Sequence, residues 1–433
     1  MLPNILHLFV LYCLHLNKIQ MQQARLTLPV DPKNPNSETL KVTDASGTIF
    51  MPGERRIEIR DAHGKIAGIR FALDARIIGY HKEGRKPPDD SSIGKRRALA
   101  AKILNELEKW DLDKKQPPNI QIFVEGDVND LSTVKATLAL QVKKMKKNDH
   151  QLSEVTATAE LAGDLLTISS LKANDSRGIF NGRIDYNLRD REGRFDIFSS
   201  LEVPKMLKEW LGIPALKDVL IRGKQIAEAE GSFHLDEDNK AQLRLTGHAR
   251  CESVTLRAVP FDSLEAAFSW RDGNLFVRDL KLQRPDGKAE GKVIVEEKQL
   301  RMELHTTLPI TIYRPFFVGV PLEMVLKDFS ERAGAAVDVK IEGGIDLTSK
   351  FTRDTTWAYF GSGSVKNLNY KGVPVNYAQS QFSASHYELD FYDGTVVFNY
   401  TNYPLRKVYD GPAEATAKVG RIRYDAPKKM VEV

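Results

Sequence analysis

The sequence predicts a mainly β protein, built on antiparallel sheet with a few short helices, and three observations lead to this fold class. Apolar and polar residues alternate along many short stretches, turn-forming residues separate these stretches, and similar stretches recur about every 110 residues. Successive side chains of a strand point to opposite faces of a sheet, so each stretch has one apolar and one polar face. Such strands are typical of half-buried antiparallel sheet.

The alternation is clearest at residues 69–77, 184–188 and 300–308, where charged or polar residues separate the apolar ones. Asp-Arg-Glu-Gly at residues 190–193 and Asp-Gly-Asn at residues 272–274 are turn-forming sequences that lie between such stretches. We therefore expect hairpins of antiparallel strands.

Helical periodicity is rare in this sequence. The best candidate helix is residues 95–110, where apolar residues recur at the spacing of one helical stripe. Residues 204–211 and 322–332 are shorter candidates. The helices are therefore expected to interrupt the strands rather than to build the core.

Residues 1–25 form an apolar N-terminal segment, and residues 26–433 form the repetitive β region. The apolar run at residues 5–16 is shorter than the roughly 20 residues of a spanning helix. It also lacks the basic start and the cleavage site of a signal peptide. A membrane anchor, a weak signal and a chain start further along, at Met21, are all compatible with this segment.

A glycine motif indicates an internal repeat. Gly-x-x-x-Gly begins at Gly64, Gly178 and Gly287, and a degenerate copy begins at Gly394, so successive copies are about 110 residues apart. We expect the glycines at bulges or bends of the strands, where a missing side chain permits strong twist.

Two further comparisons give the same period. Residues 247–270 align without a gap with residues 361–384, and this alignment places Phe268 on Phe382. Ser-Ser-Leu, ending at Leu201, likewise corresponds to Thr-Thr-Leu, ending at Leu308. We expect units of about five strands and one helix-bearing excursion, at residues 26–150, 151–260, 261–370 and, in part, 371–433.

The composition excludes some partners. Lys and Arg number 63 against 58 Asp and Glu, so the net charge is +5, and both signs are spread along the chain. Nucleic-acid-binding proteins carry a concentrated basic stripe, which is missing here. The mild excess favours weak attraction to anionic surfaces such as lipid headgroups. Basic clusters at residues 95–97 and 143–147 are read as solvated faces, with headgroup contact as the alternative.

The sequence contains no motif of an active site, and we expect a non-enzymatic protein without catalytic residues, metal or cofactor. The glycine motif lies between strands, whereas a dinucleotide fingerprint lies at a strand-to-helix turn. Cys13 and Cys251 form no zinc pattern, and we expect no disulfide between them.

A longer pattern resembles a known family. Residues 254–317 contain a strand, Arg-Ala-Val-Pro-Phe-Asp-Ser-Leu, a strand that ends at Trp270, an Asp-Gly hairpin, a strand, Asp-Gly-x-Ala-x-Gly and two more strands. This order resembles the C-terminal region of the AsmA-like family, and the resemblance covers about residues 155–400. The apolar N-terminal segment is a poorer anchor than the family's, and the chain is short, so a fragment of a longer member and a compact member are both compatible.

The resemblance implies an elongated, twisted antiparallel sheet curled into a trough, the repeating β-groove, which holds phospholipid acyl chains. It also implies a periplasmic location, association with the inner membrane and a role in outer-membrane biogenesis. The expected partners are phospholipid or another acyl lipid and the membranes, and not nucleic acid. The candidate groove-lining residues are Ile69, Phe71, Leu73, Ile77, Ile184, Tyr186, Leu188, Phe195, Ile197, Leu300, Met302, Leu304 and Leu308.

Alternation by itself leaves other interpretations open. A sheet with one apolar face must cover that face, and packing against a second sheet, as in a β-sandwich, achieves this as well. The main functional alternative is an assembly factor or scaffold that holds outer-membrane proteins by adding strands to its sheet edges. A surface adhesin built of sandwiches is a third hypothesis.

Overall fold

The computed structural model describes most of the chain, and every statement about the structure refers to the residues that it describes. These are residues 18–29, 39–53, 56–66, 69–78, 110–113, 115–127, 130–148, 150–202, 219–236, 241–297, 299–316, 323, 326–346, 357–385, 388–399, 414–425 and 430–432.

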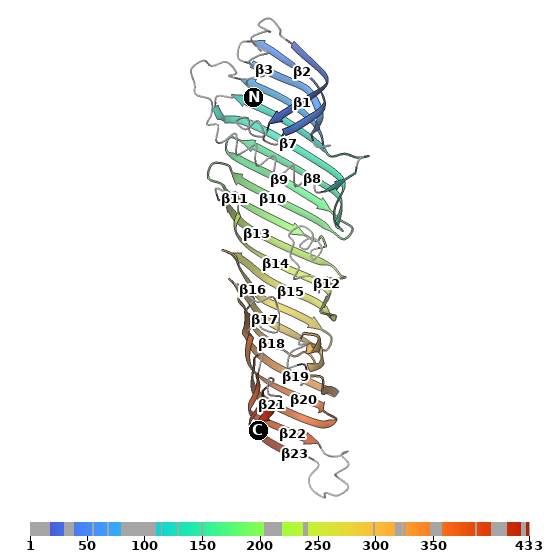
Figure 1. Cartoon of the computed structure of the whole chain (residues 1–433), viewed down its shortest axis with the longest axis vertical. Helices are drawn as coiled ribbons and strands as arrows, with labels where there is room; N and C mark the ends of the chain where they lie inside the picture. Colours follow the sequence, from blue (N-terminus) through green and yellow to red (C-terminus); the bar gives the residue numbers. More distant parts are fainter. Residues whose placement is uncertain are drawn as a thin grey trace. The chain divides into compact units, whose positions relative to one another are not determined.

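The elements that the structure describes are strands and one 3₁₀ helix (Figure 1). The strands are β1 (Lys18–Pro29), β2 (Thr39–Gly53), β3 (Arg56–Ile66), β4 (Ile69–Ile78), β5 (Asp111–Leu112), β6 (Asn119–Asp127), β7 (Asp130–Lys147), β8 (His150–Ala162), β9 (Leu165–Asn174), β10 (Ile179–Asn187), β11 (Glu192–Ser199), β12 (Val219–Ile221), β13 (Gln225–Leu235), β14 (Ala241–Leu256), β15 (Val259–Arg271), β16 (Asn274–Arg284), β17 (Gly287–Glu296), β18 (Gln299–Thr306), β19 (Phe329–Asp346), β20 (Trp357–Tyr370), β21 (Val373–Ser385), β22 (Glu388–Asn399), β23 (Glu414–Asp425) and β24 (Met430–Glu432), and the helix is η2 (Ile310–Phe316).

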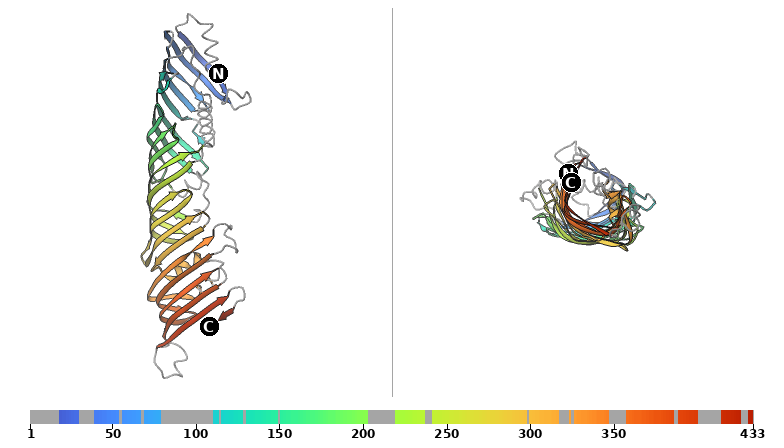
Figure 2. Two further views of the ribbon diagram at one scale, coloured as in Figure 1. Left: turned by 90° about the vertical axis from the view of Figure 1, so that its left-hand side faces the viewer. Right: turned by 90° about the horizontal axis from the view of Figure 1, so that it is seen from below.

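The prediction of a mainly β, curled antiparallel sheet is confirmed. The described strands belong to a 24-stranded open sheet. The chain divides into two compact units: unit 1 holds residues 1–213 and 232–242, and unit 2 holds residues 214–231 and 243–433. In each unit, neighbours in the sheet are mostly neighbours in sequence, joined by hairpins. Seen from below, the strands of unit 2 curve around a trough (Figure 2).

One pair of strands departs from the antiparallel prediction. β4 and β6 are parallel, with Phe71 opposite Ile120 and Leu73 opposite Ile122. A hairpin cannot join parallel strands, which require a crossover of a dozen or more residues. Residues 79–118 separate the two strands in the sequence, and of these the structure describes 110–113 and 115–118. Asp111 and Leu112 form β5, which pairs with the end of β7.

The turn predicted at residues 272–274 is confirmed in detail. Asp272 and Gly273 join β15 to β16, and both have positive φ, of 52° and 85°. Positive φ at both central residues defines a type I′ turn, whose twist matches that of the flanking strands. Lys371 and Gly372 form a turn of the same kind between β20 and β21, with φ of 47° and 80°.

The helix predictions had mixed outcomes. Residues 95–109 and 204–211 lie outside the described residues. The helix predicted at residues 322–332 is wrong at its end, because β19 starts at Phe329, which pairs with Tyr370. Sheet pairing there outweighs the local helical spacing of apolar residues. The sequence also gave no indication of η2.

The N-terminal apolar run at residues 5–16 lies outside the described residues. Residues 18–25, which the prediction placed in the same segment, belong instead to β1 and pair with β2. Of the helices in the described ranges, none has both the length and the apolar character needed to cross a membrane.

Bulges recur at equivalent places along the sheet. β3, β9, β16 and β22 each contain an extra residue opposite the neighbouring strand, near Asp61, Ser169, Asp279 and Asp393. The three aspartates have φ of 51° or 52°, a left-handed conformation that Asp tolerates better than most residues. A bulge bends its strand and increases the local twist. These bulges therefore curl the sheet once in each sequence repeat.

The copies of the predicted glycine motif do not all occupy equivalent places in the repeated strands. Gly178 and Gly287 do occupy equivalent places, just after the hairpins that follow the bulges of β9 and β16. Gly64 lies earlier, inside β3, and Gly394 lies directly after the bulge residue of β22. The prediction that these glycines lie at bulges or bends is confirmed for Gly394, which lies in the bulge of β22. Gly64, Gly178 and Gly287 are not the extra residues of the bulges in β3, β9 and β16, and each lies close to neighbouring chain instead. A Cβ on Gly178 would lie 2.1 Å from the Ser200 carbonyl oxygen.

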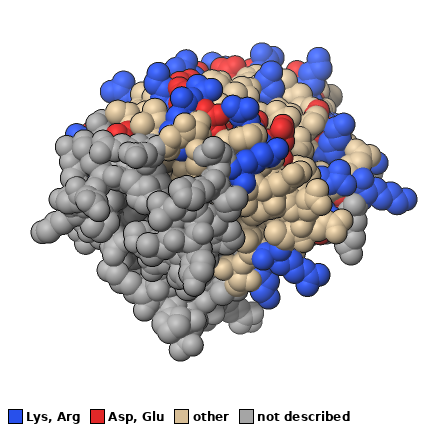
Figure 3. Space-filling view, turned by 90° about the horizontal axis from the view of Figure 1, so that it is seen from above, with Lys and Arg blue, Asp and Glu red and all other residues tan. Residues whose placement is uncertain are grey.

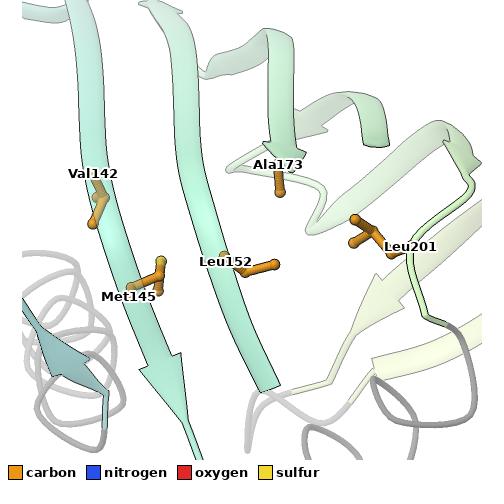
Figure 4. Close-up of a cluster of buried hydrophobic side chains, with 5 residues drawn as sticks. All are labelled: Val142, Met145, Leu152, Ala173 and Leu201. Carbon is orange, nitrogen blue, oxygen red and sulfur yellow. The ribbon is translucent and has the colours of Figure 1, made fainter. Parts of the chain in front are cut away.

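Buried hydrophobic side chains gather where crossovers leave the sheet. The cluster in unit 1 consists of Val142, Met145, Leu152, Ala173 and Leu201 (Figure 4). The cluster in unit 2 consists of Val259, Phe261, Ala289 and Leu308. The two correspond, since Phe261 follows Leu152, and Leu308 follows Leu201, by one period of the sequence repeat. Unit 2 has a further buried cluster, Ala384 with Leu389, at the hairpin end of β21 and β22.

The same hydrogen bonds hold both of these corners. In unit 1, the Leu201 backbone N–H donates to the Ser199 hydroxyl at 3.3 Å, and in unit 2 the Leu308 N–H donates to the Thr306 hydroxyl at 3.2 Å. The hydroxyl of the intervening residue, Ser200 or Thr307, accepts a backbone N–H from the adjacent strand. The Ser-Ser-Leu and Thr-Thr-Leu sequences thus turn the chain out of the sheet while burying the leucine.

We predict that Leu308→Ala lowers the free energy of unfolding by about 2–5 kcal/mol, because it leaves a cavity in a packed cluster. Leu308 is 2% exposed, whereas Leu220, on β12 of the same unit, is 47% exposed. Leu220→Ala is therefore the control, with an expected loss below about 1 kcal/mol. Urea denaturation of the purified full chain measures both, and equal losses would contradict the proposed corner.

Candidate functional site

The side chains on one face of unit 2 form an uninterrupted apolar row across its strands. Pairing from β16 to β23 brings together Leu280, Gly291, Leu304, Ile341, Gly361, Phe382, Phe391 and Ile422. At about 4.8 Å per strand, this row extends over roughly 34 Å. Parallel rows on the same face include Val293 opposite Met302 and Val295 opposite Leu300. We call this surface the apolar face of unit 2.

Unit 1 has an equivalent surface. Pairing from β4 to β11 brings together Leu73, Ile122, Leu138, Ala159, Ile168, Ile184 and Phe195. A second row joins Phe71, Ile120, Leu140, Ala157, Leu171, Gly182 and Ile197. Both rows contain only apolar residues, and we call this surface the apolar face of unit 1.

Charged residues occupy the opposite face. Lys281, Glu290, His305 and Lys340 lie side by side on β16 to β19, where unlike charges adjoin. The Lys292 ammonium lies 2.7 Å from the Glu303 carboxylate across β17 and β18. Viewed from above, blue and red atoms lie beside each other in the upper part of the described surface (Figure 3). The charged face of unit 2 thus carries both signs among the residues named.

The apolar rows are half-buried rather than buried, although they lie in the middle of the strands. Leu304 and Phe382 in unit 2, and Leu138 and Ile184 in unit 1, are all of this kind. In a β-sandwich the inner side chains of two sheets interdigitate and exclude water. The apolar faces of the described residues therefore do not have the burial of a sandwich interior.

Most predicted groove-lining residues lie on these two faces. In unit 1, the register places Phe71 and Ile197 in one row and Leu73, Ile184 and Phe195 in another. The others on the apolar faces are Ile77 and Tyr186 in unit 1, and Leu300, Met302 and Leu304 in unit 2. Leu188 lies in the turn after β10, where its N–H donates to the Asp164 carbonyl.

Two of the predicted lining residues have a different role. Leu308 lies beyond the end of β18 in the buried cluster of unit 2, and Ile69, at the first position of β4, is 4% exposed. Alternation correctly indicates their face, but strand ends are covered by neighbouring chain. Both residues stabilise the fold, and neither side chain is accessible to a ligand.

Sequence reasoning missed several aromatic residues of the apolar faces. Phe268, Phe382 and Phe391 in unit 2, and Phe233 in unit 1, lie beside glycines or other rings. The gapless alignment that superposes Phe268 on Phe382 was the signal that could have identified two of them. Alternation did not single out Phe268 and Phe382, because small residues such as Ala267, Ser269 and Ser383 lie beside them in the sequence.

Two titratable side chains on the apolar face of unit 2, Tyr359 and Cys251, are partly removed from water. Burial raises the pKa of Tyr359 to about 12 and also raises the pKa of the Cys251 thiol. Burial acts in this direction because it disfavours the charged form of a group. Cys251 pairs with Leu264 across β14 and β15. The ionised forms of these two side chains are therefore disfavoured where they lie.

The crossover after β18 covers one end of this face. Ile312, Tyr313 and Phe316 pack against the buried cluster of unit 2, and the Tyr313 hydroxyl is hydrogen-bonded to Thr306. Arg314 fixes the far side of the crossover by donating to the carbonyls of residues 326, 327 and 329. Burial of Tyr313 outweighs its hydrogen bond with Thr306 and raises its pKa to about 12.

A buried aspartate–histidine pair lies at the equivalent corner of unit 1. The Asp175 carboxylate accepts the backbone N–H groups of residues 177, 178 and 202, and His150 Nε2 lies 3.1 Å from it. Both side chains are 2% exposed. Burial alone would raise the pKa of Asp175, but the hydrogen bonds from His150 and the three N–H groups outweigh it and lower the pKa to about 2.

The described residues contain no group of three or more His, Cys, Asp or Glu side chains that could hold a metal ion.

Comparisons with known proteins give no relative for this chain. No family model matches it, and neither a curated protein nor a solved structure is significantly similar.

We predict that Asp175→Asn lowers the free energy of unfolding at pH 7 by about 2 kcal/mol. This is the free energy that corresponds to lowering the carboxyl pKa from 3.8 to about 2. A depressed carboxyl pKa contributes stability above the unfolded value of 3.8, and this contribution is lost as the pH falls from about 4 to about 2. The pH dependence of unfolding in that window should therefore be weaker in the variant.

Asp338→Asn is the matched control, because Asp338 also pairs with a histidine, at 2.9 Å from His305, but is 62% exposed. Exposed pairs contribute little. Urea denaturation at pH 7 and pH 3 compares the variants, and a loss from Asp338→Asn as large as that from Asp175→Asn would refute the role of burial.

Proposed function

We propose that this protein is a non-enzymatic lipid-binding scaffold that holds the acyl chains of phospholipids on the apolar faces of its curled sheet. The observation that carries the proposal is the central row of unit 2, which is uncharged over its whole length and half-buried although it lies in mid-strand. An apolar surface that stays half-exposed in the described part of the chain favours an apolar ligand.

The two faces of the sheet suit an amphipathic ligand. Each CH₂ group that leaves water for the apolar face contributes roughly 0.8 kcal/mol, so acyl chains need no specific polar contact. The polar group of such a lipid would remain in water beyond the ends of the strands. Crossover residues such as Tyr313 cover one end of the face in unit 2. The opposite end is therefore the one from which we expect the polar group to project.

The wider role that the family resemblance implies belongs to the same proposal. A lipid-transfer function in the cell envelope, in support of outer-membrane biogenesis, would place the protein in the periplasm with an attachment to the inner membrane. The curled sheet and its apolar faces are compatible with that role, and the sequence resemblance is the basis for it.

A second candidate function has its own observation. β24 pairs with β23 only at Arg423–Asp425, and within the described residues the outer edge of β23 from Glu414 to Ile422 has no strand beside it. Open edges can accept an added strand. This edge favours the assembly-factor hypothesis, in which the sheet holds an extended segment of another protein.

We predict that phospholipid co-purifies with the full chain expressed in a bacterial envelope, and that Leu304→Asp abolishes this binding. A carboxylate in the middle of the apolar face is costly to desolvate, and hydrocarbon cannot pair with it. Native mass spectrometry with lipid extraction measures the bound lipid, and circular dichroism checks that the variant retains its strands.

Ile294→Asp is the matched control. Ile294 pairs with Arg301 on the charged face, one strand from Leu304, so its change introduces the same charge on the other side of the sheet. This variant should retain its lipid. A folded wild-type protein free of lipid would argue against the proposal and favour strand addition at β23.

A further inference from the structure

Phenylalanine rings lie across glycines of the adjacent strand on both apolar faces. The pairs are Gly64 with Phe71 and Gly193 with Phe233 in unit 1, and Gly247 with Phe268 and Gly361 with Phe382 in unit 2. Three of the pairs stand directly opposite each other in the strand register. The arrangement therefore recurs twice in each unit.

The distances show that these rings lie along the sheet. A Cβ built on Gly361 would be 2.4 Å from Cζ of Phe382, and one on Gly193 would be 2.2 Å from Cζ of Phe233. Cζ is the far tip of the ring. Side chains of strands usually stand perpendicular to the sheet, which would keep the tip away from the neighbouring backbone. Here each ring occupies the space that a side chain on the glycine would fill.

Other cross-strand pairs on these faces combine large and small residues in the same way. Leu138 faces Ala159 at the place in unit 1 that Gly247 and Phe268 occupy in unit 2, one sequence repeat later.

The corners of the two units show the same exchange of sizes. Ala173 faces Phe180 in unit 1, whereas Leu282 faces Ala289 at the corresponding place of the next repeat, so the large residue has moved to the other strand. Each repeat thus keeps one large residue opposite one small residue, although the residues differ.

The ring of Phe382 is the most central of these in unit 2. It lies in the long apolar row, and its centroid is 6.5 Å from that of Phe391 on the next strand. The two rings are tilted by 50° to each other, and together they offer a broad apolar area to a ligand. Phe360, on the neighbouring strand β20, points to the other face and is 58% exposed.

We propose that the rings laid over glycines, Phe268 on Gly247 and Phe382 on Gly361, form the floor on which acyl chains rest in unit 2. The glycines act as specificity determinants, because the missing side chain allows each ring to lie close against the sheet. Room is thereby left above the rings for hydrocarbon that crosses the strands. This inference rests on the proposed function and assigns the contact to particular residues.

The test is site-specific photo-crosslinking in the full chain. Phe382 is replaced by p-benzoylphenylalanine, and Phe360 is replaced in the same way as the matched control on the adjacent strand. Each protein is incubated with vesicles of phosphatidylethanolamine and phosphatidylglycerol, irradiated and analysed by mass spectrometry. The expected result is a covalent phospholipid adduct at position 382 and none at position 360.

A third crosslinking position separates this inference from the proposed function. Leu304 lies in the same apolar row but next to no phenylalanine–glycine pair on its neighbouring strands. An adduct at position 304 without one at position 382 would overturn the aromatic floor and leave lipid binding intact. Absence of adducts at both positions would refute both, and equal adducts at positions 382 and 360 would overturn the inference as non-specific contact.

A simple truncation gives a second readout. Phe382→Ala should weaken the binding of a fluorescent phospholipid at least roughly fivefold, because a large apolar contact area is removed. Phe360→Ala should change it by less than about twofold. If Phe382→Ala binds as well as the wild-type protein while circular dichroism shows the sheet intact, the ring is not part of the contact surface.

Discussion

The structure depends on an antiparallel ladder in which each strand has one apolar and one charged face, while no second layer covers the middle of the apolar rows in the described residues. Backbone hydrogen bonding holds neighbouring strands together, and the largest fully buried side chains, such as Leu201 and Leu308, lie at or beyond the ends of the strands. Leu201 and Leu308 are the centres of that burial, at the points where crossovers leave the sheet. This separation permits a stable fold whose central apolar surface stays half-exposed, which is the basis of the proposed lipid binding.

Bulges curl the sheet, and cross-strand pairs of one large and one small residue shape its apolar face. Bulges at Asp61, Asp279 and Asp393 bend the strands at regular intervals, because the extra residue disrupts the ladder on one side. Large residues face small ones across the strands, as with Phe382 and Gly361. The sequence repeat is weak because either member of such a pair can be the large one. What recurs is the summed volume of the pair rather than the identity of each residue.

Polar groups lie either on the exposed face of the sheet or in corners where hydrogen bonds satisfy them. Charged residues lie on the face opposite the apolar rows, where pairs such as Lys292 with Glu303 remain exposed and contribute little to stability. The buried carboxylate of Asp175 lies at a corner, where three backbone N–H groups and His150 satisfy it. The raised pKa values of Tyr359 and Cys251 show that the ionised forms of these two side chains are disfavoured where they lie.

The sequence by itself determined the fold class, the face on which Leu73, Ile184 and Leu304 lie, and the Asp272–Gly273 turn, because alternation and turn chemistry are properties of neighbouring residues. Only the tertiary structure decided which partner each residue meets. It placed three bulges near Asp61, Asp279 and Asp393, with only Gly394 of the predicted glycines beside one of them, made β4 and β6 parallel and converted residues 329–332 from predicted helix to strand. It also assigned Leu308 to a buried corner and laid Phe382 over Gly361. These outcomes depend on the register between strands and on the path of the crossovers, which bring together residues far apart in the chain, and a local pattern does not encode them.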